Sequence, residues 1–295
     1  MGGSGSEFRI RPRMRVEWPP KLNKTSLQRE GRFYCVYRIG MRAKGRLSKR
    51  NKKRGATKRR MRGGANAPTV APLPGKVYVF YHIYCNDNSP PIVKDQCMRI
   101  IFSRLYDRAD KIYCFLAGEQ AKIDEVEGMI KNYGTKFVIA KKGPGDTSYE
   151  RFTLLEIPKY VKPEDKFLYI HSKGAKSKDA EDIFWWRTWL EYGVMARHEE
   201  CIAKLGEYDV VGVNYSEKII GKHFSGNFWW ATGKYYLTLP NEISNSGPKP
   251  YYEPERYVLT GKDVKYHDIE GGRLPENQGL YGTNFYPSKY VDFNK

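Results

Sequence analysis

The chain has 295 residues, of which 40% are apolar and 14% aromatic, enough for one or two domains with a sizeable core. No apolar run reaches the roughly 18–20 residues of a membrane-spanning helix and no secretion signal is recognisable, so we expect a cytoplasmic protein without a membrane span. The cysteines lack the C-x-x-C spacing of a zinc site and favour small buried thiols in a reducing compartment. There are five of them: Cys35, Cys85, Cys97, Cys114 and Cys201.

The formal net charge of +19 is concentrated at the amino-terminal end. Residues 1–75 hold 21 Lys and Arg against 3 Asp and Glu, which leaves residues 76–295 nearly neutral. Residues 1–8 have the composition of a linker with a cloning scar, and residues 9–75 have that of a flexible basic tail ending in Pro and Gly. Such a tail either contacts a polyanion, such as RNA, DNA or an acidic surface, or is a solvated segment.

From residue 76 onward, strand patterns alternate with helix patterns. Aromatic and β-branched runs predict the strands, and apolar residues at helical spacing predict the helices between them. Thr147 and Glu150 fit a capping box, which predicts that the third helix starts there. This alternation indicates an α/β fold with a mostly parallel sheet covered on both faces and ligands at the carboxyl ends of its strands. The predicted strands cover 76–84, 111–116, 136–140, 165–170 and 208–213, and the predicted helices cover 90–105, 119–132, 147–158 and 179–205.

The fourth predicted strand ends in the motif His171-Ser172-Lys173-Gly174. A histidine, a serine, a lysine and the N–H groups of a glycine-terminated loop could together hold a diphosphate, with the lysine supplying charge compensation in place of a metal. The alternative is an ordinary strand-to-helix loop with a solvated lysine, and spacing alone does not separate the two.

In a second motif, polar residues alternate with large apolar ones: His223-Phe-Ser-Gly-Asn-Phe-Trp-Trp-Ala. Sugars are recognised by stacking on aromatic faces and by amides that hydrogen-bond hydroxyl groups, and Asn227 beside Trp229 and Trp230 suits both tasks. The alternative is a core strand filled with aromatic rings. Because successive side chains of a strand point to opposite faces, at least one of the two tryptophans is expected in the core.

The long fourth helix carries Trp185, Trp186 and Trp189 around Arg187. Arg187 could reach an anion, whereas the tryptophans are more typical of packing on a helix. Acidic residues at the start of this helix resemble a metal cluster in composition, but they are better explained by interaction with the helix dipole.

A fourth segment, Tyr251-Tyr-Glu-Pro-Glu-Arg-Tyr, places carboxylates among aromatic residues late in the chain. A carboxylate there could act as the general base for an acceptor hydroxyl. We prefer Glu255 to Glu253 for this role because Glu255 begins a plausible helix. The alternative is the start of a surface helix.

Several common catalytic motifs are missing from the sequence. It has no G-x-x-x-x-G-K-[ST] loop, no G-x-G-x-x-G after a strand, no G-x-S-x-G elbow and no H-E-x-x-H. This argues against a P-loop NTPase, a dehydrogenase of the usual type, an α/β-hydrolase and a zincin.

In combination, the motifs resemble a family of GT-A-type glycosyltransferases of bacterial polysaccharide loci and large DNA viruses. The resemblance covers about residues 76–260, and its specific pieces are His-Ser-Lys-Gly and His-Phe-Ser-Gly-Asn-Phe-Trp-Trp. If it holds, the fold is GT-A-like, residues 76–214 form a nucleotide-sugar half and residues 215–295 form an aromatic-rich acceptor half. The basic tail has no counterpart in the family. The matching stretches are 82–84, 103–107, 169–174, 186–187 and 223–230.

The resemblance implies transfer of a sugar, with UDP-sugars favoured as donors, to a hydroxyl of a glycan or glycoprotein acceptor. His82 and Tyr84 would line the nucleotide pocket, and Lys173 would stabilise the departing diphosphate. Most GT-A enzymes place an Asp-x-Asp pair that binds Mn²⁺ or Mg²⁺ where this chain has His171-Ser-Lys, so the resemblance leaves both a reaction with Mn²⁺ or Mg²⁺ and a metal-independent reaction open. The implied donor-site residues are His82, Tyr84, His171, Ser172, Lys173, Gly174 and Arg187, the acceptor-site residues are His223, Asn227, Trp229 and Trp230, and Glu255 is the base.

A different class of function also fits the composition. In this alternative the chain is a non-enzymatic nucleic-acid-binding or virion protein that acts through the basic tail. If the chain is viral, whether as this alternative or as a glycosyltransferase, we expect it in the host cytoplasm. The near-neutral charge of residues 76–295 argues against it, because a nucleic-acid-binding domain usually carries a basic face of its own.

Overall fold

A computed structural model of the chain describes residues 75–145, 149–176, 180–218, 220–245 and 250–270. All of these residues lie within the compact unit Asn66–Lys295. The expected linker, the basic tail and Cys35 lie outside the described residues. Within those residues, no helix combines the length and the apolar character needed to cross a membrane. The four described cysteines are free and buried, as the sequence predicts: Cys85, Cys97, Cys114 and Cys201.

The centre of the fold is a seven-stranded sheet in the order β3-β2-β1-β4-β8-β5-β9. Strands β1 to β4 run parallel, β8 lies antiparallel between β4 and β5, and β9 pairs parallel with β5. The mostly parallel α/β fold predicted from the sequence is therefore confirmed. The strands are β1 (Val77–Cys85), β2 (Lys111–Gly118), β3 (Phe137–Gly143), β4 (Lys166–His171), β5 (Val210–Gly212), β8 (Trp229–Thr232) and β9 (Tyr266–Asp268), with β6 (Tyr215–Ser216) and β7 (His223–Phe224) in a separate hairpin.

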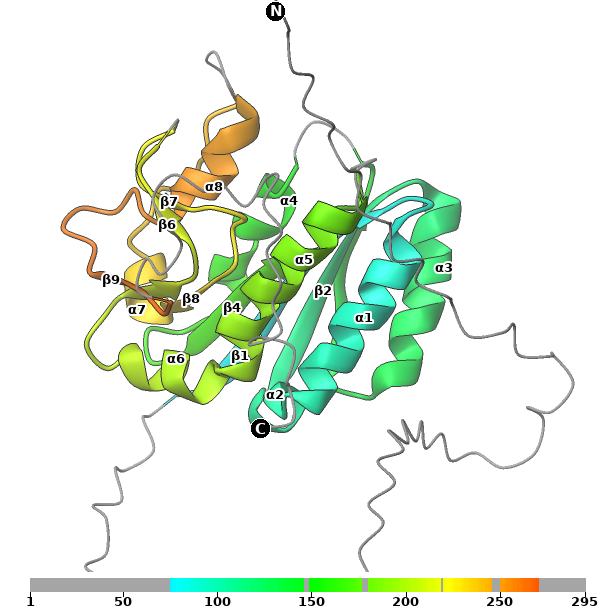
Figure 1. The fold of residues 1–295 in the computed structure, drawn as a ribbon, viewed down its shortest axis with the longest axis horizontal. Helices are drawn as coiled ribbons and strands as arrows, with labels where there is room; N and C mark the ends of the chain where they lie inside the picture. The colour runs from blue at the N-terminus through cyan, green and yellow to red at the C-terminus, as the bar shows by residue number, and fades with distance from the viewer. Residues whose placement is uncertain (1–74, 146–148, 177–179, 219, 246–249, 271–295) are drawn as a thin grey trace, which may run out of the picture. The chain divides into compact units, whose positions relative to one another are not determined.

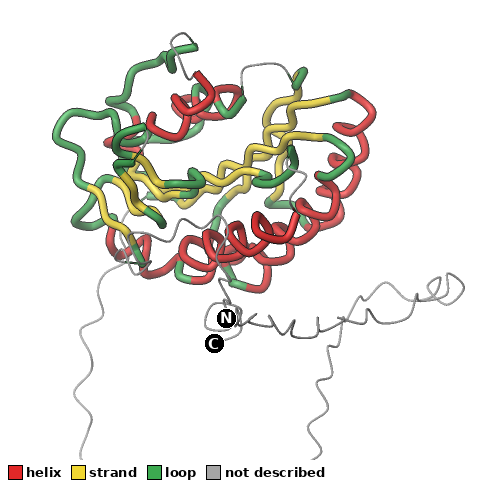
Figure 2. The backbone as a smooth tube through the Cα atoms, turned by 45° about the horizontal axis from the view of Figure 1, so that its top comes forward, coloured by secondary structure: helices red, strands yellow, loops and turns green. Residues whose placement is uncertain are grey.

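Helices cover both faces of this sheet (Figures 1 and 2). On one face lie α1 (Ser89–Phe102), α3 (Gln120–Ile130), α5 (Ala180–Glu191) and α6 (His198–Lys204), and on the other lie α4 (Arg151–Leu154), α7 (Gly233–Tyr236) and α8 (Glu253–Tyr257). Shorter helical segments complete the chain: α2 (Leu105–Arg108), η1 (Lys131–Tyr133), η2 (Ile157–Lys159), the π-helical η3 (Tyr192–Ala196) and η4 (Pro250–Tyr252).

Strand alternation divides the core into two layers. On β1, Val79 and Tyr81 point into the layer shared with α1, α3 and α5, whereas Tyr78 and Phe80 point into the aromatic layer under α4, α7 and α8. Every residue of β1 except the half-buried Tyr84 is buried, as the continuous apolar run predicts for a strand covered on both faces.

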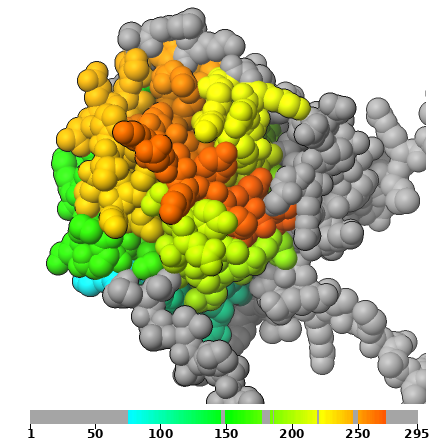
Figure 3. Space-filling view, turned by 90° about the vertical axis from the view of Figure 1, so that its left-hand side faces the viewer, coloured from blue at the N-terminus to red at the C-terminus, as the bar shows by residue number. Residues whose placement is uncertain are grey.

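Two local expectations differ from the structure. The helix expected from Thr147 begins only at Arg151, and its N-cap residue Glu150 makes no side-chain capping bond. Thr147, the other residue of the predicted capping box, lies outside the described residues. The helix expected over 179–205 is interrupted by the π-helical turn Tyr192–Ala196. After residue 214, β8 and β9 extend the sheet, with β8 between β4 and β5 and β9 at its edge. Figure 3 shows segments from this region, yellow to orange, forming much of one face.

Candidate functional site

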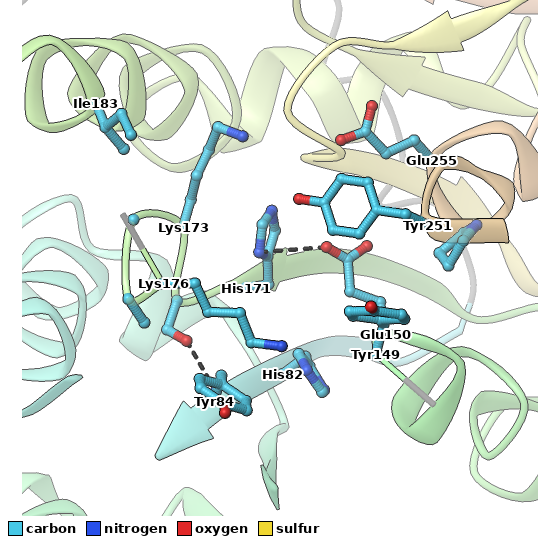
Figure 4. Close-up of a pocket in the computed structure, with 14 residues that line it drawn as sticks. His82, Tyr84, Tyr149, Glu150, His171, Lys173, Lys176, Ile183, Tyr251 and Glu255 are labelled. Carbon is cyan, nitrogen blue, oxygen red and sulfur yellow. Dashed lines mark hydrogen bonds and ion pairs between the residues drawn. The ribbon is translucent and has the colours of Figure 1, made fainter. Parts of the chain in front are cut away.

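A pocket opens at the carboxyl ends of β1 and β4, the edge where a parallel sheet is expected to bind ligands (Figure 4). Seven of the predicted site residues line it together: His82, Tyr84, His171, Ser172, Lys173, Gly174 and Glu255. Sequence reasoning did not assign the remaining lining residues to a site: Tyr149, Glu150, Ala175, Lys176, Ile183, Tyr251 and Pro254.

Backbone pairing between β1 and β4 forms the floor of the pocket. His82 and His171 are register partners on the two strands. Beyond them, the Ser172 N–H donates to the His82 carbonyl at 2.9 Å, and the Ser172 Oγ accepts the Tyr84 N–H at 2.9 Å. The serine of the motif therefore ties the two strand ends together, which holds the loop that follows in one position.

The loop after β4 is shaped by a glycine and held from behind by an arginine. Gly174 has a φ of +99°, and a Cβ there would lie 2.9 Å from the Ile183 side chain, so a larger residue would be strained and crowded. Arg187, which is buried, donates from Nη1 to the Lys173 carbonyl at 2.9 Å and pairs with Glu191 at 3.4 Å. Arg187 therefore supports the loop from outside the pocket and does not line it.

Two lysines of this loop bring positive charge to the pocket. The Lys173 ammonium lies 3.6 Å from the centre of the Trp186 ring, and the Lys176 ammonium lies 4.1 Å from the Tyr84 ring and 4.7 Å from the Tyr149 ring. Burial lowers the pKa of both lysines below the ordinary value. Aromatic faces compensate part of the ammonium charge, but an anion in the pocket would do so more strongly.

Two carboxyl groups face these lysines from other elements. Glu150, which precedes α4, has its pKa raised to about 7 by burial, against which a hydrogen bond from Asn227 and the charge of Lys173 act only in part. Glu255 on α8 also has a raised pKa because of burial, and the nearby Lys173 opposes this shift. A carboxyl whose pKa approaches neutrality is suited to exchange protons with a substrate.

The two histidines of the floor are held neutral. Burial lowers the pKa of His82 to about 3, and its Nδ1 lies 2.8 Å from the Thr153 hydroxyl. Burial, with the charge of Lys173, likewise lowers the pKa of His171 to about 3. His171 Nε2 lies 3.0 Å from the Gly226 carbonyl, and Nδ1 lies 3.3 Å from Glu150 Oε1.

The aromatic motif after residue 222 does not reach the pocket. Trp229 and Trp230 are fully buried on opposite faces of β8, and their indole N–H groups donate to Asn227 Oδ1 at 2.7 Å and to the Val194 carbonyl at 2.8 Å. Buried rings cannot stack on a sugar, so the structure gives both tryptophans a packing role in place of the expected acceptor contact. The core-strand alternative describes them better.

Two polar residues of this motif, His223 and Asn227, are buried as well. His223 has its Nδ1 2.7 Å from the Gly221 carbonyl and lies outside the pocket lining. Asn227 is fully buried and donates from Nδ2 to Glu150 Oε2. Asn227 therefore acts on the pocket through Glu150 rather than by contact with an acceptor.

Glu150 is the main residue that sequence reasoning missed. The sequence pattern places it in a capping box, although a residue that follows the third strand of a parallel sheet is expected near the ligand-binding edge. That position was the available signal; its partner Asn227, 77 residues later, could not be identified from spacing.

The donor set at the end of β4 does not fit the divalent metal site that a GT-A-type enzyme usually has there. His171 Nε2 is hydrogen-bonded to the Gly226 carbonyl. The next two side chains, Ser172 and Lys173, offer a hydroxyl and an ammonium group, which are not the carboxylate ligands that Mg²⁺ prefers. Across the described parts of the chain, no three His, Cys, Asp or Glu side chains are grouped so that they could hold a metal ion. We therefore derive no step through a metal.

Comparisons with known proteins identify a family but no activity. The model of the family described as "Domain of unknown function (DUF8361)" matches residues 80–257. No curated protein matches the sequence.

Three solved structures resemble the chain weakly. The 4-diphosphocytidyl-2C-methyl-D-erythritol synthase of Anaerococcus prevotii is 11% identical over 65% of this chain and 87% of its own, with a TM-score of 0.35. The inositol-1-phosphate CTP transferase of T. maritima is 11% identical over 66% and 86%, with a TM-score of 0.38. The glycosyltransferase GlyE of Streptococcus pneumoniae is 13% identical over 65% and 45%, with a TM-score of 0.34. Similarity this low says nothing about the chemistry of the pocket.

Proposed function

The chain belongs to the DUF8361 family, and we propose that it is a GT-A-type glycosyltransferase that moves a sugar from a nucleoside-diphosphate donor to a hydroxyl of a glycan or glycoprotein. One observation carries this proposal. Two lysines and two half-buried carboxyl groups surround one pocket at the carboxyl edge of a mostly parallel sheet. This combination offers cations for an anionic leaving group and a base for an attacking hydroxyl in the same place.

The lysine side of the pocket is the proposed donor site. Lys173 and Lys176 would face the diphosphate, whose negative charge would compensate their partly buried ammonium groups. His82, Tyr84 and the Ser172–Gly174 loop would hold the nucleotide, with UDP-sugars as the favoured donors. In this proposal the two ammonium groups stabilise the departing diphosphate.

Glu255 is the proposed base. The acceptor oxygen would attack the anomeric carbon of the donor, and the bond from that carbon to the diphosphate would break with its electron pair going to the phosphate oxygen. Glu255 would take the proton of the acceptor hydroxyl. Glu255 enters the pocket from α8, and the Lys173 ammonium points toward it, so the same lysine would stabilise the ionised form of the base (Figure 4).

Tyr251 is the proposed aromatic contact for the acceptor. It lines the pocket, and 55% of its surface is exposed, so its ring is accessible to a sugar in a way that the buried Trp229 and Trp230 are not. Sugar rings stack readily on exposed aromatic faces. This reassigns the acceptor contact from β8 to the segment before α8.

Donor binding and hydrolysis by the full-length chain test the proposal. UDP-, GDP- and dTDP-sugars are each offered with Mn²⁺ and with EDTA, and binding is measured by calorimetry while hydrolysis is followed by release of the nucleotide. We expect selective binding and slow hydrolysis of one donor class. A chain that binds none of these donors would contradict the proposal, and EDTA sensitivity would show a metal requirement.

A pair of variants on the same helix tests the base. Glu255→Gln should reduce transfer by about 10²–10⁴-fold while donor affinity stays nearly unchanged. Glu253→Gln is the matched control, since Glu253 pairs with Arg256 at 3.2 Å and does not line the pocket. Loss of donor binding in Glu255→Gln would show that Glu255 holds the donor instead.

The charge asymmetry of the chain favours a second activity, polyanion contact by the basic tail. Residues 1–75 carry 21 Lys and Arg against 3 Asp and Glu. Such contact would be electrostatic and would weaken steeply with salt. It is separable from transfer because the pocket lies wholly within residues 82–255.

A further inference from the structure

The loop that carries Lys173 is held from the helix side through two of its backbone carbonyls. Arg187 Nη1, on α5, donates to the Lys173 carbonyl at 2.9 Å. Gln96 Nε2, on α1, donates to the His171 carbonyl at 3.1 Å. These two carbonyls lie on either side of Ser172, which is itself bonded to β1. The backbone around Lys173 is therefore fixed from both sides.

Both of these side chains are anchored on one buried carboxyl group. Glu191, the last residue of α5, is fully buried. Its Oε1 accepts from Gln96 Nε2 at 2.9 Å and lies 3.4 Å from Arg187 Nε. Its Oε2 lies 3.0 Å from Nε of Arg99, on α1. Glu191 thus joins two helices that lie side by side on one face of the sheet (Figure 1), and both of its links to the loop start from Oε1.

The orientation of the Gln96 amide follows from its neighbours. A carbonyl oxygen can only accept, so the amide atom that faces the His171 carbonyl is Nε2. Its two hydrogens serve the His171 carbonyl and Glu191 Oε1, and its Oε1 accepts the hydroxyl of Tyr81 at 2.5 Å. Gln96 and Tyr81 are fully buried. A buried amide whose hydrogens and oxygen are all paired is held in one orientation.

The other contacts that shape the loop come from the same face of α5. A Cβ at Gly174 would lie 2.9 Å from the Ile183 side chain, and the Trp186 ring lies 3.6 Å from the Lys173 ammonium. One helix face therefore contacts both the backbone and the ammonium group of the loop. The four residues of α5 that take part follow helical spacing: Ile183, Trp186, Arg187 and Glu191.

Two further observations favour a role beyond packing. Burying charged groups between helices is a poor way to gain stability, because apolar side chains of similar size fill such a space without the cost of desolvation. Glu191 is also followed directly by the π-helical turn Tyr192–Ala196. Irregular turns of this kind inside helices occur frequently at functional sites.

We propose that Glu191 is a positioning residue of the donor site, which acts through Gln96 and Arg187 to set the place of the Lys173 ammonium in the pocket. This inference rests on the glycosyltransferase function proposed above. Glu191 does not line the pocket, so its effect is exerted through Lys173. A cation stabilises a departing diphosphate best when it is already in place, because it then need not be reoriented as the bond breaks.

Hydrogen exchange in the full-length chain measures this positioning without any ligand. Glu191→Gln keeps the shape of the side chain but replaces one acceptor oxygen with an amide nitrogen, so the contacts of Glu191 with its donors cannot all be kept. We expect amide exchange in residues 171–175 to speed up by about tenfold or more, while exchange in β2 and β3 stays unchanged. Unchanged exchange in residues 171–175 would overturn the proposal.

Thr188→Val is the matched control for this measurement. Thr188 is buried on the same helix, and its hydroxyl accepts from Arg99 Nη2 at 3.4 Å. It lies outside the pocket lining, and valine has nearly its shape. This variant should leave exchange in residues 171–175 and kcat unchanged. If it matched the effect of Glu191→Gln, a general loosening of α5 would explain both results and the proposal would be overturned.

A double-mutant cycle connects the loop to the reaction. The substrate is whichever of the UDP-, GDP- and dTDP-sugars the unmodified chain hydrolyses fastest. We expect kcat to fall about tenfold in Glu191→Gln and about 10²-fold in Lys173→Met. Because Glu191 acts through Lys173, the double variant should fall only about 10²-fold. A fall of about 10³-fold would show that the two residues act independently, which contradicts the proposal.

Two milder variants apply if Glu191→Gln does not fold. Gln96→Met removes the bond to the His171 carbonyl, and Arg187→Lys keeps a positive charge near Glu191 but lacks the fork that also reaches the Lys173 carbonyl. Each removes one of the two links to the loop. Each should speed exchange in residues 171–175 and lower kcat only when Lys173 is present. Failure of both effects in both variants would overturn the proposal.

The outcomes separate this inference from the proposed function. If the unmodified chain binds and hydrolyses no nucleotide sugar, the glycosyltransferase function itself fails, and hydrogen exchange decides alone whether Glu191 holds the loop. If the unmodified chain is active and Glu191→Gln keeps both its kcat and its exchange in residues 171–175, only the positioning role is overturned. Faster exchange across the whole sheet would also overturn it, because it would show a loss of overall stability.

Discussion

The stability of the Glu150→Gln variant should depend on pH in a way that follows from the burial of Glu150. Burial raises the pKa of this carboxyl from 4.5 to about 7, so the folded state holds the proton more tightly than the unfolded chain does. The contribution of Glu150 to stability is therefore complete below the unfolded pKa and is lost as pH rises toward the folded pKa. The amide that replaces it is neutral at every pH and carries no such loss.

The size of the effect follows from the shift in pKa. A difference of about 2.5 pKa units at roughly 1.4 kcal/mol per unit gives about 3 kcal/mol once Glu150 is ionised in the folded state. Only 16% of the side chain is exposed, so screening by solvent reduces this figure little. Relative to the unmodified chain, the variant should gain about 2–3 kcal/mol in free energy of unfolding between about pH 5 and about pH 8.

Urea denaturation at several pH values measures this difference without reference to any activity. The control is Glu156→Gln, because the pKa of Glu156 is lowered by Lys141 and Lys159 and loss of its charge should destabilise slightly at neutral pH, the opposite sign. A stability difference for Glu150→Gln that stays constant with pH would refute the reasoning. It would show that Glu150 is ionised in the folded state throughout this range.

Three further results are expected. Lys173→Met should lower kcat for donor hydrolysis by about 10²-fold, because an electrostatic stabiliser of the leaving group is lost. Steady-state kinetics measures this change, and an unchanged kcat would show that Lys173 does not stabilise the leaving group. Gly226→Ala should cost about 2–4 kcal/mol in thermal unfolding, since a positive φ and a Cβ 2.5 Å from Leu190 are both unfavourable; a fully stable variant would show that the turn can relax. Deletion of residues 1–65 should leave hydrolysis intact, because the pocket is lined by residues 82–255, and should abolish salt-sensitive binding to a polyanion. Loss of hydrolysis would show that the deleted residues contribute to the site.

Local patterns were sufficient to predict the strands and helices of the parallel half of the sheet. A continuous apolar run such as Val77–Cys85 can only be buried on both faces, and helices of the observed length between such runs require parallel neighbours. Because the carboxyl ends of parallel strands share one edge, His82 and the His171–Gly174 loop were expected to meet, and they do. These inferences use only contacts between residues near in sequence and one rule of sheet geometry.

Whether Trp229 and Trp230 are exposed or buried depends on which strands β8 pairs with. The same residues could line an open groove or fill a core, and only the antiparallel insertion of β8 between β4 and β5 buries both rings. Pairing between strands that lie far apart in the sequence is set by the packing of the whole domain, which cannot be predicted from a local sequence pattern.

The role of Glu150 in the pocket likewise could not be predicted from its local sequence. Its local surroundings fit a helix start, and its chemistry comes from His171 and from Asn227, 77 residues away along the chain. The burial that raises its pKa, and the Asn227 and Lys173 contacts that oppose this rise, exist only in the folded domain. Residue types and their order along the strands can be predicted from sequence, but the desolvation and partners that give a side chain its acidity come from tertiary contacts alone.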